Sequence, residues 1–163
     1  MARNIEIRSA EEKDIPGILE MLRRLKKLNE EFDTRFTVSD DMEGRAAGLL
    51  KKVIHDRDGY LVLVAFSSKK IAGLIMIDVI DRIFYSPPGE GRITEFYIMP
   101  EFRRSGLGKV MLERAYSAMK ERKIGLLTAE FPSLNVIARN FYTKDGFREL
   151  MSIFGKRMGE VAE

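Results

Sequence analysis

The segment from Met99 to Lys109 combines basic side chains with two closely spaced glycines, a combination that suits the binding of an anion. It lies between a run of residues that predicts a strand and a run that predicts a helix. Backbone N–H groups in the first turn of a helix lack intrahelical partners and carry partial positive charge, so an anion placed there satisfies both deficits. The residues expected to contribute are Arg103, Arg104, Ser105, Gly106, Leu107, Gly108 and Lys109.

The order of arginine and glycine in this segment suits a phosphate and differs from two common phosphate-binding motifs. Glycine at positions 106 and 108 would let the main chain approach a phosphate without an intervening Cβ, and the basic side chains add charge-assisted donors. The pattern Arg-x-x-Gly-x-Gly differs from the dinucleotide-binding fingerprint and from the P-loop. The residues alone therefore leave two alternatives, a phosphate cradle and an ordinary strand-to-helix turn with exposed arginines.

A second informative segment runs from Asn135 to Phe147. Asn135 is a suitable N-cap for a helix that begins at Val136, and Gly146 suits the position just beyond the end of that helix. Without further context, Tyr142 within this helix is a half-buried aromatic residue.

Together the two segments resemble the motifs of the GNAT superfamily of N-acetyltransferases. Residues 98–108 match the end of the family's motif strand and its R/Q-x-x-G-x-G/A loop, and residues 135–147 match N-x-x-A-x-x-x-Y-x-x-x-G-F in register. The resemblance covers residues 92–147 closely and the order of the earlier elements generally. It implies the transfer of an acetyl group from acetyl-CoA to an amine.

The resemblance also implies roles for individual residues. In the family the glycine loop binds the pyrophosphate of acetyl-CoA, and the preceding strand splays from its neighbour. The residues expected along the cofactor there are Phe96, Ile98 and Met99, with the N–H of Ile98 facing the thioester oxygen. The amide of Asn135 would face the pantetheine arm, and Tyr142 would act as general acid at the thioester sulfur. A phenol with an ordinary pKa near 10 is protonated at neutral pH and suits that role.

Acyl transfer further requires that the acceptor amine lose a proton, and two carboxylates are candidates for the base. Glu95 lies on the predicted motif strand, and Glu130 ends the next strand. Regular alternation puts Glu95 on the face opposite Thr94, where many family members carry a strand base, so Glu95 departs from that pattern. The spacing of Glu130 from Asn135 and Tyr142 resembles the branch that acetylates protein N-termini, including those of ribosomal proteins. A water chain without a dedicated base is the third alternative.

Acidic residues gather in the part of the chain that builds the acceptor site in this superfamily. They are Glu30, Glu31, Asp33, Asp40, Asp41 and Glu43. Such a rim would suit a cationic acceptor such as a polyamine or a lysine side chain, and a solvated acidic loop that balances nearby arginines and lysines explains it equally. A small-molecule amine, a protein N-terminus and an antibiotic all remain open as acceptors.

The elements that must position these residues follow from hydrophobic periodicity. Strands are expected at residues 5–8, 60–66, 71–85, 92–99, 124–130 and 147–150, the last extending to about residue 154, and helices at residues 15–29, 42–54, 106–122 and 136–144. Asp14 is the expected N-cap of the first helix. This order predicts one α/β (α+β) domain over residues 1–163, with a mixed central sheet of about six to seven strands flanked by about four helices, as in the GNAT fold.

Composition excludes several other classes of function. The 163 residues contain no cysteine, which excludes a disulfide framework, a thiol nucleophile and a thiolate metal site. The one histidine, His55, lies in a charged stretch, so no metal site is expected. No signal peptide is visible, and no apolar run approaches the roughly 18 residues that span a bilayer. A cytoplasmic protein without a membrane partner is expected.

Two rival functions remain to be weighed. A nucleic-acid-binding module would use the basic run Leu22–Lys27, but the net charge is only +3, acidic residues are interspersed, and no aromatic-interleaved basic strand occurs. No nucleic-acid partner is therefore expected. A catalytically silent acyl-CoA sensor would keep the glycine loop and show no turnover, and the presence of Tyr142 argues against it. Nothing in the sequence decides between a monomer and a homodimer.

Overall fold

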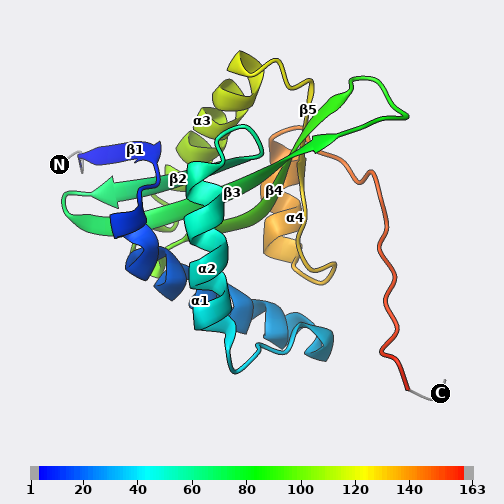
Figure 1. The fold of residues 1–163 in the computed structure, drawn as a ribbon, viewed down its shortest axis with the longest axis horizontal. Helices are drawn as coiled ribbons and strands as arrows, with labels where there is room; N and C mark the ends of the chain where they lie inside the picture. Colours follow the sequence, from blue (N-terminus) through cyan, green and yellow to red (C-terminus); the bar gives the residue numbers. More distant parts are fainter. Residues whose placement is uncertain (1–3, 160–163) are drawn as a thin grey trace.

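The computed structural model describes residues 4–159, which contain a five-stranded mixed sheet (Figure 1). The strands lie side by side in chain order, and all neighbours are antiparallel except β4 and β5, which are parallel. The strands are β1 (Ile5–Ser9), β2 (Tyr60–Ser67), β3 (Lys70–Asp81), β4 (Gly89–Ile98) and β5 (Leu126–Ala129).

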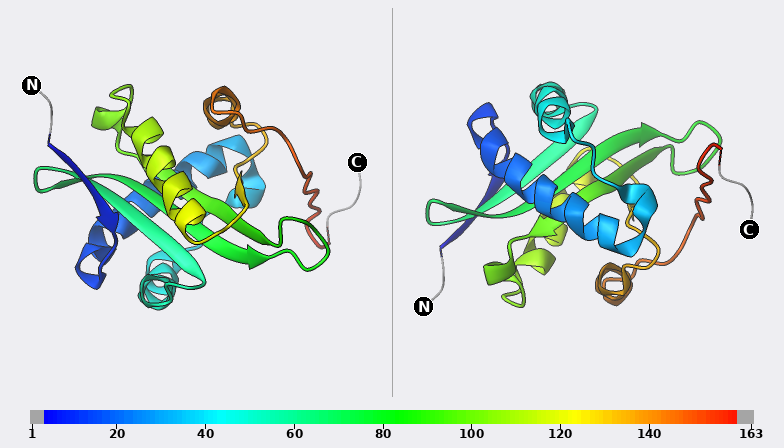
Figure 2. Two further views of the ribbon diagram at one scale, coloured as in Figure 1. Left: turned by 90° about the horizontal axis from the view of Figure 1, so that it is seen from above. Right: turned by 90° about the horizontal axis from the view of Figure 1, so that it is seen from below.

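Helices cover both faces of this sheet. They are α1 (Ile15–Phe32), α2 (Met42–His55), α3 (Leu107–Glu121) and α4 (Val136–Lys144), with 3₁₀ turns at Glu12–Asp14, Thr34–Phe36 and Pro100–Phe102. α1 and α2 pack on the face that carries Met76 and Asp78. α3 packs on the opposite face, so closely that a Cβ at Gly73 would lie 2.6 Å from Met111 Sδ. Figure 2 shows α3 in front of the sheet from above and α1 in front from below.

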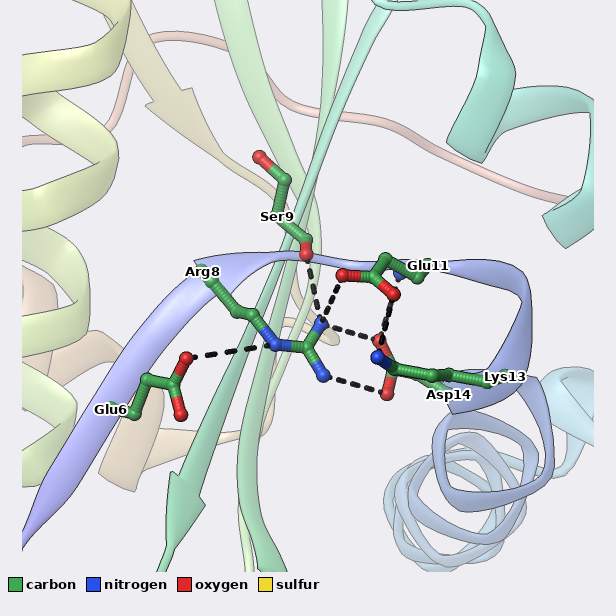
Figure 3. A network of polar contacts seen from close by, with 6 residues as sticks. All are labelled: Glu6, Arg8, Ser9, Glu11, Lys13 and Asp14. Atoms are coloured by element: carbon green, nitrogen blue, oxygen red, sulfur yellow. Dashed lines mark hydrogen bonds and ion pairs between the residues drawn. The ribbon is translucent and has the colours of Figure 1, made fainter.

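A polar network fixes the start of α1 against β1 (Figure 3). The Arg8 guanidinium donates to both carboxylate oxygens of Asp14, at 2.7 and 3.0 Å, and the Glu11 N–H donates to the same carboxylate at 2.8 Å. Burial raises the pKa of Asp14, but the Arg8 and Glu11 hydrogen bonds outweigh it and hold that pKa below its usual range. The expectation that Asp14 caps α1 is wrong, because its side chain makes these bonds and no cap bond to α1.

The final predicted strand is the main difference from the expected fold. Residues 147–154 form no strand, and Leu150, Met151, Ile153 and Phe154 are 56–95% exposed. They find no partner strand in the described sheet, so the apolar content of this segment is not enough to make it a strand. The described sheet therefore has five strands, fewer than the six to seven expected.

The β3–β4 hairpin also differs from its prediction. β3 ends at Asp81 instead of continuing to residue 85, and β4 begins at Gly89 instead of residue 92. Ladder pairing holds the glycine-containing start of β4, with Asp81 opposite Gly89. The remaining helices and strands agree with their expected positions to within a few residues at each end. None of the helices within residues 4–159 is long and apolar enough to cross a membrane.

Candidate active site

β4 and β5 separate in the middle of β4. They pair over residues 90–93 of β4, and the last contact is the Glu130 N–H donating to the Ile93 carbonyl at 3.0 Å. On the other side of β4, the Met99 N–H donates to the Ala72 carbonyl at 2.9 Å. Because N–H groups alternate sides along a strand, those of Phe96 and Ile98 face the open side. The splay that the family resemblance implies is therefore present.

The loop after β4 presents the first turn of α3 beside this gap. Gly106 precedes the helix with φ +83°, a left-handed conformation that favours glycine. Leu107 N–H donates to Ser105 Oγ at 3.4 Å, while the Ser105 hydroxyl donates to the Phe102 carbonyl at 2.5 Å. A Cβ at Gly108 would lie 3.5 Å from the Phe141 ring, in the space between α3 and α4. The first main-chain N–H groups of α3 other than that of Leu107 can therefore donate hydrogen bonds to a phosphate oxygen.

The basic side chains of the loop have separate positions. Arg103 turns back to β4, where its Nε donates to the Ile98 carbonyl at 3.0 Å and its guanidinium lies 5.2 Å from the centre of the Tyr97 ring. Arg104 is exposed, and the Lys109 ammonium lies 4.0 Å from Glu113. Arg103 therefore braces the loop against the strand, and Arg104 and Lys109 are the cations that remain available to an anion.

α4 brings Tyr142 to the same gap. Its start agrees with the prediction, since Asn135 Oδ1 accepts the Ala138 N–H at 3.0 Å. The Tyr142 ring is 6% exposed and stacks almost parallel on Phe131, with centroids 5.5 Å apart. Its ring centroid also lies 6.5 Å from that of Phe96 on β4. Burial raises the pKa of Tyr142 far above its usual value, so the hydroxyl keeps its proton at every physiological pH.

Glu95 lies on the opposite face of β4, toward α1. Its side chain is 17% exposed, and the Lys26 ammonium donates to it at 2.5 Å. The pKa of Glu95 is raised, mainly because burial disfavours the charged form, with Lys26 lowering it and the charges of Glu130 and Asp78 raising it. Glu130 itself is exposed. The two predicted base candidates thus lie close enough to influence each other, together with Asp78, which the sequence interpretation missed.

A β-bulge decides which way these side chains face. Met76 of β3 pairs with Glu95 and Ile77 pairs with Ile93, so Thr94 is the extra residue. A bulge breaks the alternation of side chains, and Thr94 and Glu95 both line one cavity. The prediction that they occupy opposite faces is wrong for this reason. Glu95 therefore shares the face of Thr94.

That cavity has a volume of about 310 Å³ and lies between α1, α2 and the sheet. Its apolar wall includes Leu22, Leu50, Val53 and Met76. The acidic rim nearby is largely neutralised by its own neighbours. The ion pairs are Lys27–Glu30 at 3.2 Å, Asp33–Arg35 at 3.5 Å, Asp41–Arg45 at 3.6 Å and Arg23–Glu43 at 3.8 Å. These pairs favour the solvated acidic loop over a cation-binding rim.

Comparison with known proteins gives the family. Residues 25–147 match the Acetyltransferase (GNAT) family. An uncharacterized N-acetyltransferase of Archaeoglobus fulgidus is 27% identical over 146 residues, which cover 88% of this chain and 93% of that protein. The chain belongs to the GNAT family and is an acetyl-CoA-dependent acetyltransferase.

Solved structures show the same fold. A predicted acetyltransferase of Clostridium acetobutylicum, crystallised with acetyl-CoA, is similar with a TM-score of 0.77 and 20% identity, covering 94% of this chain and 96% of that chain. The aminoglycoside 6'-N-acetyltransferase AAC(6')-IG of Acinetobacter haemolyticus has a TM-score of 0.74 and 18% identity, covering 94% and 99%. The expected α/β GNAT fold is confirmed, and the resemblance to the branch acetylating protein N-termini stays a prediction.

Proposed function

We propose that the protein acetylates a primary amine that enters from the cavity and attacks the acetyl group directly. One observation carries the proposal: the open edge of β4 has Tyr142 and the α3 turn on one face and the Glu95 cavity on the other. A cofactor and an acceptor can therefore reach the same edge from opposite faces. The acceptors consistent with this arrangement are a small amine such as a polyamine, an antibiotic amine, a lysine side chain and a protein N-terminus.

The chain's own groups offer contacts for the pyrophosphate and the pantetheine arm of the cofactor. The first N–H groups of α3 and the exposed Arg104 and Lys109 would hold the pyrophosphate. The N–H groups of Phe96 and Ile98 would pair with the pantetheine arm, beside Met99 and the capping residue Asn135. When bound, acetyl-CoA supplies the acetyl group as an activated thioester.

Three proton and charge tasks remain for the protein. The Ile98 N–H is oriented to stabilise negative charge on the acyl oxygen, since it already faces the gap. Tyr142 Oη holds the proton that the departing sulfur takes, because burial keeps this phenol protonated. Glu95 accepts the proton of the amine as the new C–N bond forms and the C–S bond breaks. Its place on the cavity wall and its raised pKa both favour it over the exposed Glu130.

Thermal melting with saturating acetyl-CoA tests the cofactor half of the proposal. Ligand at about 100 times its Kd adds roughly 2.7 kcal/mol of stability, which for a chain of this size raises Tm by about 5–10 °C. NADH and ATP are the ligand controls and should produce no comparable shift.

A matched pair of variants tests whether acetyl-CoA binds at the first turn of α3. Gly108→Asp puts a carboxylate in the first turn of α3, where it is compatible with the helix dipole and repels a phosphate. Ser117→Asp makes the same charge change on the exposed side of that helix. The acetyl-CoA shift should vanish in the first variant and persist in the second. Equal shifts in both would place the cofactor elsewhere.

A panel of amines, read by release of free thiol, tests the acceptor half. Binding of acetyl-CoA without thiol release on any amine would leave the silent acyl-CoA-binding protein as the function. Binding to a random DNA duplex that weakens steeply with salt would favour the nucleic-acid module instead. The cytoplasmic location, the single domain over residues 1–163 and the oligomeric state stay predictions.

A further inference from the structure

Among the residues that the structure describes, the acceptor cavity has no lining cation beyond the one that already pairs with Glu95. Lys26, Asp78, Thr94 and Glu95 line it, and only Lys26 is positively charged. Lys26 already forms an ion pair with Glu95, with 2.5 Å between Lys26 Nζ and Glu95 Oε1. A ligand of this cavity must therefore complement carboxylate charge. The volume of the cavity, about 310 Å³, is at the small end of the range for small-molecule sites.

Asp78 is the carboxylate without a partner. No hydrogen bond or ion pair within 4 Å reaches its side chain from the rest of residues 4–159. Its cross-strand neighbour Arg92 acts on it only at longer range, because the Arg92 Nε donates to Glu90 at 3.0 Å. Burial raises the pKa of Asp78. A charge-assisted hydrogen bond from a ligand would relieve that cost.

The Lys26 side chain indicates what kind of cation fits at Glu95, the other carboxylate of the cavity. It presents an ammonium on a methylene stem to Glu95 across the cavity from α1. The Lys26 side chain is 35% exposed, so it can move out to solvent when another alkylammonium takes its place.

The sheet fixes the spacing of the two carboxylates. Met76 pairs directly with Glu95, and Asp78 is two residues further along β3 on the same face. On a regular ladder the backbone positions of such diagonal neighbours lie roughly 7–8 Å apart, and the bulge at Thr94 lies between these two. Met76, Leu50 and Val53 supply apolar surface for a short hydrocarbon chain beside them.

We propose that the acceptor is a short alkyl diamine whose distal ammonium binds Asp78 while its reacting amine lies at Glu95 in place of Lys26. The inference rests on the proposed acetyl transfer and adds the substrate class. An amine with a carboxylate beside it is disfavoured, because that group would meet Asp78. A monoamine of the same length fits the apolar wall and leaves Asp78 unpaired. The reaction balances as follows. The bound ammonium first loses one proton to solvent, which frees the lone pair of the amine. The amine nitrogen then bonds to the acetyl carbon, its remaining excess proton passes to Glu95, the C–S bond breaks, and Tyr142 supplies the proton that the thiolate gains.

Steady-state kinetics with 1,4-diaminobutane and butylamine test this directly. The wild-type protein should prefer the diamine by about 10- to 100-fold in kcat/KM, the range expected of one charge-assisted hydrogen bond. Asp78→Asn should remove that preference, mainly by raising KM for 1,4-diaminobutane. Asp81→Asn, a matched change at the exposed end of β3, should leave both substrates unaffected.

Equilibrium binding provides a second readout independent of turnover. Calorimetry should show 1,4-diaminobutane binding to the wild type, with at least tenfold weaker binding to Asp78→Asn and unchanged binding to Asp81→Asn. Equal use of the two amines by the wild type, or equal loss for both in Asp78→Asn, would overturn the diamine assignment. Thiol release with other amines alone would do the same and leave acetyl transfer standing. Absence of any acetyl-CoA melting shift would instead remove the proposed function itself.

Discussion

The two faces of β4 are built in different ways. On the α3–α4 face, the groups that would meet the cofactor come from two short stretches of sequence, residues 96–109 and 135–142. On the α1–α2 face, side chains from five different elements line one cavity. The residues of the first face are close together in the sequence, so they can be recognised there as motifs. The second depends on how distant segments pack, so its chemistry is specific to this chain.

The α1–α2 face of β4 would bind the acceptor and is called the acceptor face below; the α3–α4 face is called the donor face. If the acceptor face holds the base, Glu95→Gln should have the largest effect on turnover. We expect kcat at pH 7 to fall by about 100-fold or more, since a positioned general base contributes at least that much. The residual rate should rise with pH as more of the amine is unprotonated in solution. Because the pKa of Glu95 is raised, the wild-type rate should fall off on the acid side at a higher pH than an ordinary carboxyl would give.

Glu130→Gln is the matched variant for that measurement. It removes a neighbouring exposed carboxylate and should shift the acid limb to slightly lower pH, because the Glu130 charge raises the pKa of Glu95. A large loss of rate, or a profile displaced to higher pH, in Glu130→Gln with normal kinetics in Glu95→Gln would make Glu130 the base.

On the donor face, Tyr142→Phe should have a smaller effect on turnover. We expect kcat to fall by about 10- to 100-fold, toward the lower end for acid catalysis, because a thiolate is a fairly good leaving group. The ring packs among other aromatic side chains, so phenylalanine preserves those contacts. Tm and the acetyl-CoA melting shift should remain unchanged. A wild-type kcat would leave Tyr142 with a packing role only.

The smallest expected effect concerns the anchor of α1, which belongs to the acceptor face. Asp14→Asn removes a charge-assisted pair with Arg8 and should cost about 2 kcal/mol of stability, or roughly 4–8 °C in Tm. The folded-state pKa of Asp14 is depressed, so this stability is present above its unfolded pKa and is lost as pH falls through the folded pKa. The Tm difference between variant and wild type should therefore shrink below about pH 4.

Glu6→Gln is the control for that experiment. Glu6 is 3.9 Å from the same guanidinium on an exposed side chain and should contribute little. The acetyl-CoA melting shift should be the same in both variants, since neither touches the donor face. A reduced shift in Asp14→Asn would show that the two faces are coupled.

Sequence reasoning succeeded where one local rule decides the conformation. The left-handed glycine just beyond α4, Gly146, and the cap at Asn135 each follow from a single residue type in its immediate context. It failed where tertiary packing decides. The bulge at Thr94 has no signature in the residues themselves, and the apolar pairs after Phe147 looked like strand while finding no partner in the described sheet. Asp78 was missed because nothing in its sequence neighbours shows that it remains unpaired.

The bulge in β4 has a consequence for how positions along this strand are compared with those of other proteins. One extra residue puts Thr94 on the cavity face beside Glu95, while residues 96 and 98 keep their places toward α3 and α4. Gain or loss of one residue at this point would change which position before Glu95 faces the cavity and leave the glycine loop undisturbed. Counting residues back from the glycine loop therefore identifies the face of a strand position only as far as the bulge.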